Sequence, residues 1–521
     1  MRKFFSKTLL CTIALCAIAL WGTASTCAEP SRLNINGDYS AAAIVAGKPT
    51  TINILITIET PAVVARTVRE PVAVSLVIDR SGSMDSARKL DYAILAGKSL
   101  VRSLDNDDHF ALVTYDDKVN VLYPLGRITD KERIYRLLDK IQPGGYTFLS
   151  GGLEKGIEQF TKSELRGVRR VILLSDGLAN QGVTNAERVA AIGNAARRQG
   201  VNVSTIGLGL DYDEDLMQLL AQRGGGQYYY VKNSEDLPSI FQRELSLANT
   251  AYTRELKARL ALSPLVTDSK IYGYSTDINK NEIQVEMSDF SSSEKRQILL
   301  SLTFTPDPAV STQQLGNLRL IYNDIDGNEQ LVETALAVNL AKTEAEAIEA
   351  NTKAQEQIRK VEDEILIVQA SEAQIAAMKA LELGQLEEAR KLLDAPAPML
   401  NAAAPRNREV AAIAEQLQLA YESLDAASQD KDLMQDLIKE SKNTAYQNAQ
   451  GMKQGILLQN GDQGLLVEKL QKALADKGFY TGPINGIYSD LVTEAVKAYQ
   501  LANSLTADGL AGPATQNSLG L

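Results

Sequence analysis

Between residues 72 and 248, short apolar runs alternate with amphipathic segments, and this alternation limits the folds open to the chain more than any other feature. Residues 85–104 and 186–199 have the apolar spacing of helices. The apolar runs that predict buried strands are 72–78, 110–115, 119–123, 170–174, 201–206 and 227–231. Strands that alternate with helices in this way predict an α/β unit at 71–248, with a doubly wound, mostly parallel sheet covered by helices on both faces.

The segments on either side of this unit alternate polar and apolar residues with the period of a strand. The alternation is weak over 31–70 and clearer over 250–340, for example in 297–304. We interpret 250–340 as a β-sandwich. The strands of 31–70 can pair with it, and the α/β unit is then an insertion within a β domain.

Residues 341–450 are rich in Ala, Glu, Lys, Gln and Leu, which predicts three or four helices. Pro396, Pro398 and Pro405 are expected to divide them into two pairs. One apolar stripe at helical spacing is formed by Ile358, Val361, Ile365 and Val368. It suits helical hairpins that pack on themselves, and also a coiled coil or a partner-binding arm. Residues 451–464 include four glycines and predict a linker before a small module at 465–521.

The composition of the 521 residues excludes several classes of protein. With 45% apolar and 23% charged residues, the chain is neither wholly disordered nor a multi-span membrane protein. The net charge of -11 disfavours binding to nucleic acid or to an anionic membrane. The three cysteines all lie within the first 27 residues, and there is one histidine, which excludes cysteine-based and paired-histidine metal sites from the body of the chain.

Residues 1–28 have the pattern of an export signal. Basic residues at the start are followed by the uncharged stretch 8–28, which ends in small residues. We expect cleavage after Ala28, with Ala24 as a second position; a lipid anchor on Cys27 and an uncleaved membrane anchor are the alternatives. No later segment is apolar enough to span a membrane. The chain is therefore expected to be exported and to be periplasmic or associated with the cell wall.

Hydroxyl and carboxyl side chains follow two of the predicted strands, and one further hydroxyl stands at the end of a loop. Asp79, Ser81 and Ser83 come directly after the strand 72–78, although Ser83 or Asp85 would also serve as an ordinary helix N-cap there. Thr147 ends the glycine-rich loop 144–147, and Asp176 follows the strand 170–174. Since open α/β sheets bind ligands at the carboxyl ends of their strands, these groups can converge at one edge.

Oxygen ligands of this kind suit Mg²⁺, Mn²⁺ or Ca²⁺ rather than soft metals. Only Asp79 and Asp176 carry charge in the set, so a bound dication stays electrophilic and keeps a position for water or another ligand. A carboxylate from a partner can fill that position. The expected chemistry is adhesion through a metal bridge, not hydrolysis.

The residues Asp79, Ser81, Ser83, Thr147 and Asp176 resemble the metal-ion-dependent adhesion site of von Willebrand factor type A domains. The phrases Leu173–Gly177 and Thr205–Gly209 also fit that family. The resemblance implies that Ser81, Ser83 and Thr147 bind the ion directly and that Asp79 and Asp176 act through water. It implies Mg²⁺ first, with Mn²⁺ or Ca²⁺ as alternatives. The flanking β region is similar to secreted bacterial members whose A domain is inserted into a β domain.

The module at 465–521 contains two related phrases, 485–492 and 508–515, each of which turns on glycine and then opens a helix. This internal repeat resembles the three-helix type of peptidoglycan-binding domain. Ser489 and Val492 depart from the usual glycine and threonine of that pattern. Binding to the cell wall is one interpretation, and a compact module reused for protein contact is the other.

Three further signals have simpler explanations. The segment 324–327 suggests a calcium loop, but Tyr322 falls where an oxygen ligand is required, so we predict a hairpin turn. The acidic cluster 211–215 suits the N-terminus of a helix. His109 stands at a strand start and is expected to be structural.

Together these features predict an exported, non-enzymatic adhesion or scaffold protein. It would bind an acidic protein partner through a divalent cation and be tethered to the cell wall by its C-terminal module. The alternative is an accessory subunit of an envelope enzyme or transporter that docks through the helices of 341–450. A hydrolase is disfavoured because no nucleophile or acid/base pair stands out in the sequence.

Overall fold

The computed structural model describes residues 32–521 with the exception of 62–70, 162–166, 250, 275, 280, 286, 292–293, 325–326, 450–457, 459–464, 504, 506, 508 and 520–521. The predicted export signal at 1–28 lies outside the described residues, as does nearly all of the predicted linker at 451–464. Among the described residues, no helix combines the length and the apolar character that crossing a membrane requires.

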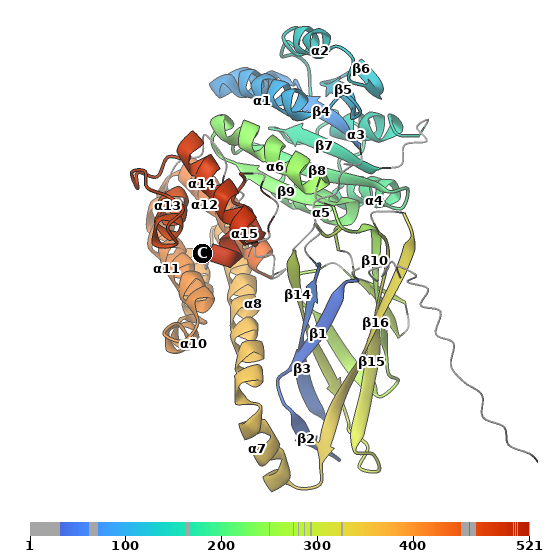
Figure 1. Cartoon of the computed structure of the whole chain (residues 1–521), viewed down its shortest axis with the longest axis vertical. Helices are drawn as coiled ribbons and strands as arrows, with labels where there is room; N and C mark the ends of the chain where they lie inside the picture. The colour runs from blue at the N-terminus through green and yellow to red at the C-terminus, as the bar shows by residue number, and fades with distance from the viewer. Residues whose placement is uncertain are drawn as a thin grey trace, which may run out of the picture. The chain divides into compact units, whose positions relative to one another are not determined.

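The α/β unit is built on a six-stranded sheet with the order β6-β5-β4-β7-β8-β9 (Figure 1). Its strands are β4 (Val72–Asp79), β5 (His109–Tyr115), β6 (Val119–Arg127), β7 (Val168–Ser175), β8 (Val201–Leu208) and β9 (Gly225–Val231). All neighbours are parallel except β6, which runs antiparallel to β5. The predicted, mostly parallel sheet is therefore confirmed. Every residue of β4 and β8 is buried, as is expected of strands in a sheet that is covered on both faces.

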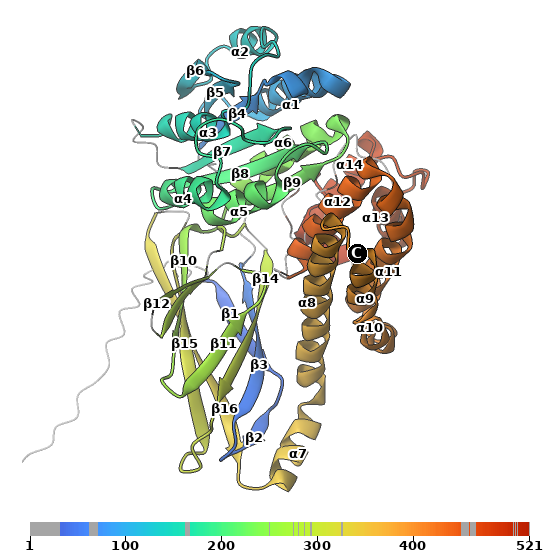
Figure 2. The same ribbon diagram turned by 180° about the vertical axis from the view of Figure 1, so that it is seen from behind.

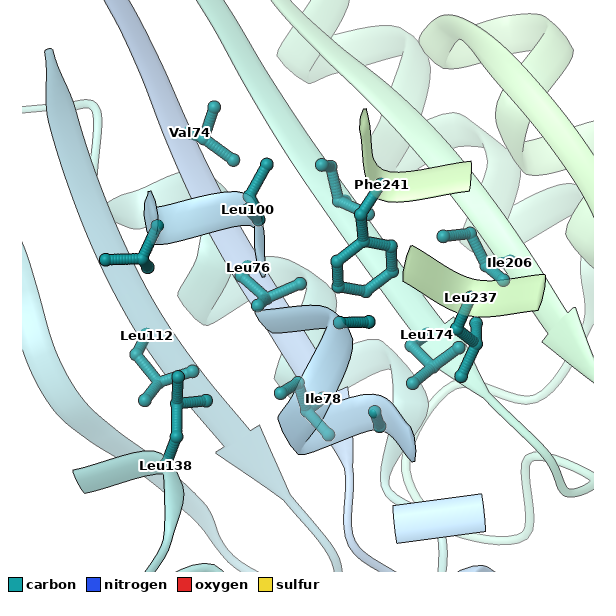
Figure 3. Packing of buried hydrophobic residues seen from close by; sticks show 14 of the residues in the cluster. Val74, Leu76, Ile78, Leu100, Leu112, Leu138, Leu174, Ile206, Leu237 and Phe241 are labelled. Atoms are coloured by element: carbon teal, nitrogen blue, oxygen red, sulfur yellow. The ribbon is translucent and has the colours of Figure 1, made fainter. Parts of the chain in front are cut away.

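Helices cover both faces of this sheet (Figure 2). One face packs against α1 (Lys89–Ser103), α2 (Lys131–Leu138) and α6 (Leu237–Asn249), and the other against α3 (Leu149–Glu158), α4 (Ala186–Arg197) and α5 (Glu214–Gly224). Alternate residues of β4 enter the two cores: Leu76 and Ile78 face α1 (Figure 3), and Val77 faces the opposite core.

The first helix begins later than the sequence predicted. Residues Gly82–Arg88 form the 3₁₀ segment η1, and α1 starts only at Lys89, not at 85. Ala87 and Arg88 both have left-handed backbone angles, with φ of 50° and 57°, and no side chain caps α1. A helical period in the sequence does not show such a break, because the break depends on backbone conformation and not on apolar spacing.

Two further sheets share one apolar core. The first has the order β1-β3-β14-β11 and the second the order β12-β13-β10-β15-β16-β2. Their strands are β1 (Asn34–Tyr39), β2 (Ala43–Val45), β3 (Thr50–Glu59), β10 (Arg254–Leu262), β11 (Val266–Ile271), β12 (Thr276–Asn279), β13 (Glu282–Val285), β14 (Lys295–Phe304), β15 (Thr312–Asn323) and β16 (Glu329–Ala341). All pairs are antiparallel except β2 with β16.

Strands from before and after the α/β unit pair with one another. β3 pairs with β14 from Thr50 opposite Phe304 to Glu59 opposite Lys295, and β2 pairs with β16. The α/β unit thus lies in the chain between β3 and β10, and strands from the two sides of it pair with each other. Alternate residues of β3, among them Ile54, Ile56 and Ile58, fill the shared core.

The helical region contains six helices among its described residues, so the prediction of three or four was wrong. They are α7 (Glu344–Lys353), α8 (Gln355–Glu382), α9 (Leu386–Asp394), α10 (Ala397–Ala403), α11 (Arg408–Gln429) and α12 (Lys431–Ala449). Gly384, with φ of 72°, follows the end of α8, a break that the sequence analysis missed. Pro396 and Pro398 stand at the start of α10 and begin a helix there, because proline is accepted in the first turn.

The apolar stripe of α8 has a partner that neither sequence interpretation included. Val361 and Val368 are buried against Leu55 of β3 and Leu299 of β14. The following part of α8, from Ile367 to Leu381, packs with α9 to α12 in a core of their own. The helices therefore do pack on themselves, but the stripe that suggested a coiled coil covers the outer face of a β-sheet.

The last module contains α13 (Leu465–Asp476), α14 (Asp490–Ala502) and α15 (Pro513–Leu519) around a small apolar core. Each glycine turn is held by a buried glutamine. Gln471 accepts from the backbone N–H of Asn485 and Gly486, both at 2.9 Å, and Gln500 accepts from Gly509 N–H at 3.0 Å. The internal repeat seen in the sequence thus corresponds to two structurally similar turns.

Candidate metal centre

Asp79 is the last residue of β4 and its side chain is fully buried. One carboxylate oxygen accepts a hydrogen bond from the backbone N–H of Ser81 at 2.8 Å, and the other accepts from the Ser175 hydroxyl at 2.8 Å. Burial raises the pKa of Asp79 to about 6, and the nearby charge of Asp176 also raises it, against the opposing effect of these hydrogen bonds. Asp79 therefore fixes the shape of the loop 80–83 and carries a charge that the protein alone does not stabilise well.

The two serines of the motif lie side by side at the surface edge of the site. The Ser81 and Ser83 hydroxyl oxygens are 3.1 Å apart, and the Ser83 hydroxyl donates to Asp176 Oδ1 at 2.7 Å. Ser81 is buried and Ser83 is exposed. The group of hydroxyls and carboxylates is therefore open to solvent on the side of Ser83.

Thr147 comes from a loop that is tied to the motif through its backbone. Gly144 N–H donates to the carbonyl of Arg80 at 2.8 Å, and Gly82 N–H donates to the carbonyl of Gly145 at 3.3 Å. Gly145 has φ of +67°, and a β-carbon there would lie 2.1 Å from Asp117 Oδ1, so the close approach of the two loops requires glycine.

The Thr147 and Ser83 hydroxyls both lie next to Gly177. A β-carbon on Gly177 would lie 3.4 Å from each of these two oxygens. Thr147 is buried, and its backbone N–H donates to Asn180 Oδ1 at 2.9 Å. Ser83, Thr147 and Asp176, from three distant parts of the chain, therefore meet at the carboxyl ends of β4 and β7.

All five residues singled out from the sequence thus lie in one cluster, and their donor atoms are five oxygen-bearing groups. This donor set fits a hard divalent cation. Within the part of the chain that the structure describes, no group of three or more His, Cys, Asp or Glu side chains could hold a metal ion.

Lys89 is a member of the cluster that sequence reasoning missed. Its ammonium group is 2.8 Å from Asp176 Oδ2, and the residue is only 7% exposed. The signal was present in the sequence, because Lys89 stands at helical spacing from the apolar residues Ala93, Ala96 and Leu100. A charged residue in line with a buried stripe indicates a buried partner.

Two supporting residues, Asn180 and Ser175, were also given no role in the sequence analysis. Both act by hydrogen bonds to site residues. Asn180 does not stand out in the sequence, and Ser175 lies in the phrase Leu173–Gly177 but was given no role there. Arg80, within the motif, forms an ion pair with the buried Asp116 at 2.5 Å and so joins the motif to the end of β5.

The other candidate signals do not join this cluster. Asp213 caps α5 by accepting from Leu216 N–H at 2.9 Å, as predicted for the acidic segment. Asp324 lies in the hairpin between β15 and β16, although residues 325–326 are outside the described part. His109 begins β5, and burial lowers its pKa.

Comparison with known proteins identifies two parts of the chain. Residues 74–243 match the von Willebrand factor type A domain, and residues 463–519 match a family described as a putative peptidoglycan binding domain. Both resemblances seen in the sequence are thereby confirmed.

Two curated relatives match 213 and 284 residues. The uncharacterized protein YfbK of Escherichia coli is 29% identical over 213 residues, which are 40% of this chain and 36% of that protein. The uncharacterized protein sll0103 of Synechocystis is 25% identical over 284 residues, which are 52% of this chain and 66% of that protein. The matched region is thus less than two thirds of the length of either relative.

Solved structures match a larger share of the chain. A von Willebrand factor type A protein from Catenulispora acidiphila aligns with a TM-score of 0.58 and 16% identity, over 74% of this chain and 89% of its own. The ArnB paralog VWA2 from Sulfolobus acidocaldarius aligns with a TM-score of 0.52 and 18% identity, over 80% of this chain and 99% of its own. At these identities the likeness establishes the fold alone.

Proposed function

We propose that this chain, which carries a von Willebrand factor type A domain and a peptidoglycan-binding type of module, is an exported adhesion or scaffold protein without catalytic activity. Its A domain binds an acidic protein partner through a divalent cation, Mg²⁺ in the first place. Its last module attaches the chain to the cell wall, so that the protein acts in the periplasm or at the wall. The 1–28 segment supports export through its sequence pattern.

The observation that carries the proposal is the position of Ser83. Its hydroxyl is 2.7 Å from the buried Asp176 carboxylate, and yet the residue is exposed. Ser81, Ser83 and Thr147 would hold the cation directly, and Asp79 and Asp176 would do so through water. A cation held there supplies a Lewis acid that a partner can reach, and the neutral hydroxyls leave it able to accept a further carboxylate.

Two exposed apolar side chains next to the site support contact with a protein. Tyr146 precedes Thr147 and is 66% exposed, and Leu178 follows Gly177 and is 59% exposed. Aromatic residues such as tyrosine are enriched in protein interfaces, where they lie in the buried core of the contact. A partner that places a carboxylate at the cation would cover both.

Attachment to the wall would make the metal site more effective. Two binding modules in one chain raise the local concentration of each for its own target, without any new contact. In this arrangement the A domain meets wall-bound partners at a higher concentration than a free domain would.

The test is capture from an envelope extract in Mg²⁺ and then in EDTA. Asp79→Ala should abolish capture of the partner that EDTA releases, while circular dichroism remains unchanged. Asp85→Ala is the matched control, because Asp85 is an exposed acid in the adjoining segment η1 and should leave capture intact. Capture that persists in both Asp79→Ala and EDTA would refute the metal bridge.

A second candidate function is that of an accessory subunit of an envelope enzyme or transporter. The helical region supports it with several exposed large apolar residues: Ile348, Leu383, Met399, Leu419 and Leu433. A docking surface on these helices would be independent of the metal. Leu383→Ser with Leu419→Ser should then abolish partner capture in EDTA as well as in Mg²⁺, whereas the leading proposal expects no effect.

A further inference from the structure

Lys89 is a buried cation placed among the groups that surround the candidate metal centre. Its side chain is 9% exposed, and its ammonium nitrogen lies 2.8 Å from Oδ2 of the fully buried Asp176. The other oxygen of the same carboxylate accepts from Ser83. Asp176 therefore joins a proposed metal-binding hydroxyl on one side to a lysine on the other.

Local rules do not favour a lysine at this position. Lys89 is the first residue of α1, where the helix dipole disfavours a positive charge. The two preceding residues, Ala87 and Arg88, have left-handed backbone angles that non-glycine residues adopt rarely. Burial of an ammonium group is also costly unless it is paired. Several unfavourable features thus coincide at one buried residue, as is expected where function and not stability selects a side chain.

The loop after β8 leaves space for this side chain. Gly209 has φ of +76°, and a β-carbon there would lie 3.2 Å from Lys89 Cε and 3.3 Å from Lys89 Nζ. The carboxyl ends of β4, β7 and β8 therefore all contribute to the surroundings of the Lys89–Asp176 pair.

We propose that Lys89 is a specificity-determining residue that gives the cation-loaded centre a net positive charge and so selects an anionic partner; this inference rests on the proposed function. Asp79 and Asp176 together contribute two negative charges, which a dication alone would neutralise. With Lys89 the loaded centre has one positive charge left, and a single carboxylate balances it. The same charge lowers the affinity of the centre for the cation.

The neighbouring cations do not replace Lys89 in this role. Arg80 is paired with the buried Asp116 at 2.5 Å, and Arg88 is exposed and lies 3.1 Å from Asp91. Lys89 is the one lysine or arginine that the structure places in direct contact with a motif carboxylate among the described residues.

The experiment measures the binding of Mn²⁺ to the protein and then the binding of acetate to the Mn²⁺-loaded protein, so that it requires no natural partner. Electron paramagnetic resonance of free Mn²⁺ gives the affinity of the full chain and of the variants Lys89→Met, Lys89→Gln and Lys89→Arg. Removing the positive charge that lies 2.8 Å from Asp176 should tighten Mn²⁺ binding about tenfold in Lys89→Met and Lys89→Gln. Lys89→Arg keeps the charge and should bind within about threefold of the wild type.

Acetate tests the second half of the inference. Broadening of the ¹³C-acetate carboxyl signal by the Mn²⁺-loaded protein reports direct binding of a carboxylate at the cation. The broadening should be several-fold weaker for Lys89→Met than for the wild type at equal Mn²⁺ occupancy. A lysine with a purely structural role predicts the opposite result for the metal, because loss of a structural contact weakens binding.

Each outcome decides between the claims. Wild-type affinity, or weaker Mn²⁺ binding, in both Lys89→Met and Lys89→Gln would overturn the inference and leave the proposed function standing. Undiminished acetate broadening in those variants would overturn it as well. If the wild type binds no Mn²⁺ and Asp79→Ala still captures partner, the proposed function fails, and the role of Lys89 fails with it. Lys89→Gln can donate a hydrogen bond to Asp176, which keeps the test available if Lys89→Met does not fold.

Discussion

Among the carboxyl groups that the structure describes, Asp79 is the one whose ionisation is opposed most clearly by its surroundings. Burial raises its pKa from 3.8 to about 6 in the protein without a cation. A carboxyl group with a raised pKa in the folded state adds stability below its unfolded pKa of 3.8, and that contribution is lost as the pH rises through 6. A cation in the site would reverse this effect, because it stabilises the charged form.

Asp79→Asn should therefore remove the pH-dependent loss of unfolding free energy that ionisation of the buried Asp79 causes. In EDTA at pH 7.5 we expect the variant to exceed the wild type in unfolding free energy by up to about 3 kcal/mol, and the difference should shrink toward pH 4. Mg²⁺ should raise the melting temperature of the wild type and not that of the variant. Denaturation in urea at several pH values measures the difference. A difference that stays constant between pH 4 and pH 7.5 would contradict the assignment to Asp79.

The glycine loop offers a matched pair of variants. At Gly145 a methyl group would meet Asp117 at 2.1 Å and Asp116 Cβ at 2.9 Å, with φ of +67°; at Gly144 the nearest atom is 3.8 Å away. We expect Gly145→Ala to lose about 2 kcal/mol of unfolding free energy and to weaken Mn²⁺ binding by displacing Thr147. Gly144→Ala should stay within about 0.5 kcal/mol of the wild type. Equal effects in urea denaturation of the two variants would show that the loop is not tightly constrained at Gly145.

The residues of the centre were predictable where they follow a strand or end a glycine-rich loop. Asp79 and Asp176 could be placed at one edge because parallel strands end together, and the hydroxyl at position 147 followed from its glycine loop. Lys89 was missed since its partner lies 87 positions away in the chain. Ser175 and Asn180 were given no role for a similar reason. The hydrogen bond of Ser175 joins the ends of β7 and β4, and that of Asn180 joins two loops, and local pattern encodes neither contact.

At the scale of elements, the contact between α12 and α5 is held by charges in a largely buried position. Lys439 Nζ is 2.7 Å from one Glu214 carboxylate oxygen, and Lys442 Nζ is 3.1 Å from the other. Burial alone would raise the pKa of Glu214, but the hydrogen bond and charge of Lys439, with the charge of Lys442, outweigh it and lower the pKa to about 2. Both lysine side chains are only 4% exposed.

This contact should weaken in acid within a defined range. A carboxyl group with a lowered folded pKa adds stability above its unfolded pKa of 4.5, and the contribution is lost as the pH falls from there toward 2. The wild type should lose up to about 3 kcal/mol more than Glu214→Gln between pH 5.5 and pH 2.5. Hydrogen exchange of α5 and α12 locates the loss. Asp211→Asn is the control, since Asp211 is exposed and should follow the wild type.

The elements themselves were predictable to different degrees. Continuous apolar runs identified the strands of the α/β sheet, because burial on both faces leaves little choice of residue. The helical region was divided wrongly because the sequence analysis expected breaks only at prolines. Helices do break beside Pro396 and Pro405, but the breaks at Ala354, Gly384 and Asp430 contain no proline. The stripe of α8 was seen, but its partner was not: Leu55 and Leu299 lie in two strands far apart in the sequence.

At the scale of the whole molecule, the α/β unit is joined to the β-sheets by hydrogen bonds as well as by its two chain connections. Arg197 of α4 donates to the carbonyl of Leu256 at 2.9 Å, and Asn202 of β8 donates to Asp289 at 3.0 Å. The charged and polar ends of these contacts restrict how the α/β unit and the β-sheets can move relative to each other. The candidate metal centre lies elsewhere, at the carboxyl ends of β4 and β7, and is not part of them.

If metal binding and wall attachment reside in separate parts of the chain, one substitution in each part should separate them. Asp79→Ala should lose Mn²⁺ binding and still pellet with purified peptidoglycan, with or without EDTA. Gln500→Leu should keep Mn²⁺ binding and no longer pellet with peptidoglycan. Gln500 is buried and forms hydrogen bonds with the Gly509 N–H at 3.0 Å, the Leu510 carbonyl at 2.8 Å and the Thr515 hydroxyl at 3.0 Å. Loss of these hydrogen bonds, each worth about 1 kcal/mol, should disrupt the second glycine turn. Release of the wild type from peptidoglycan by EDTA would show instead that the wall is held through the cation, and that the two activities share one site.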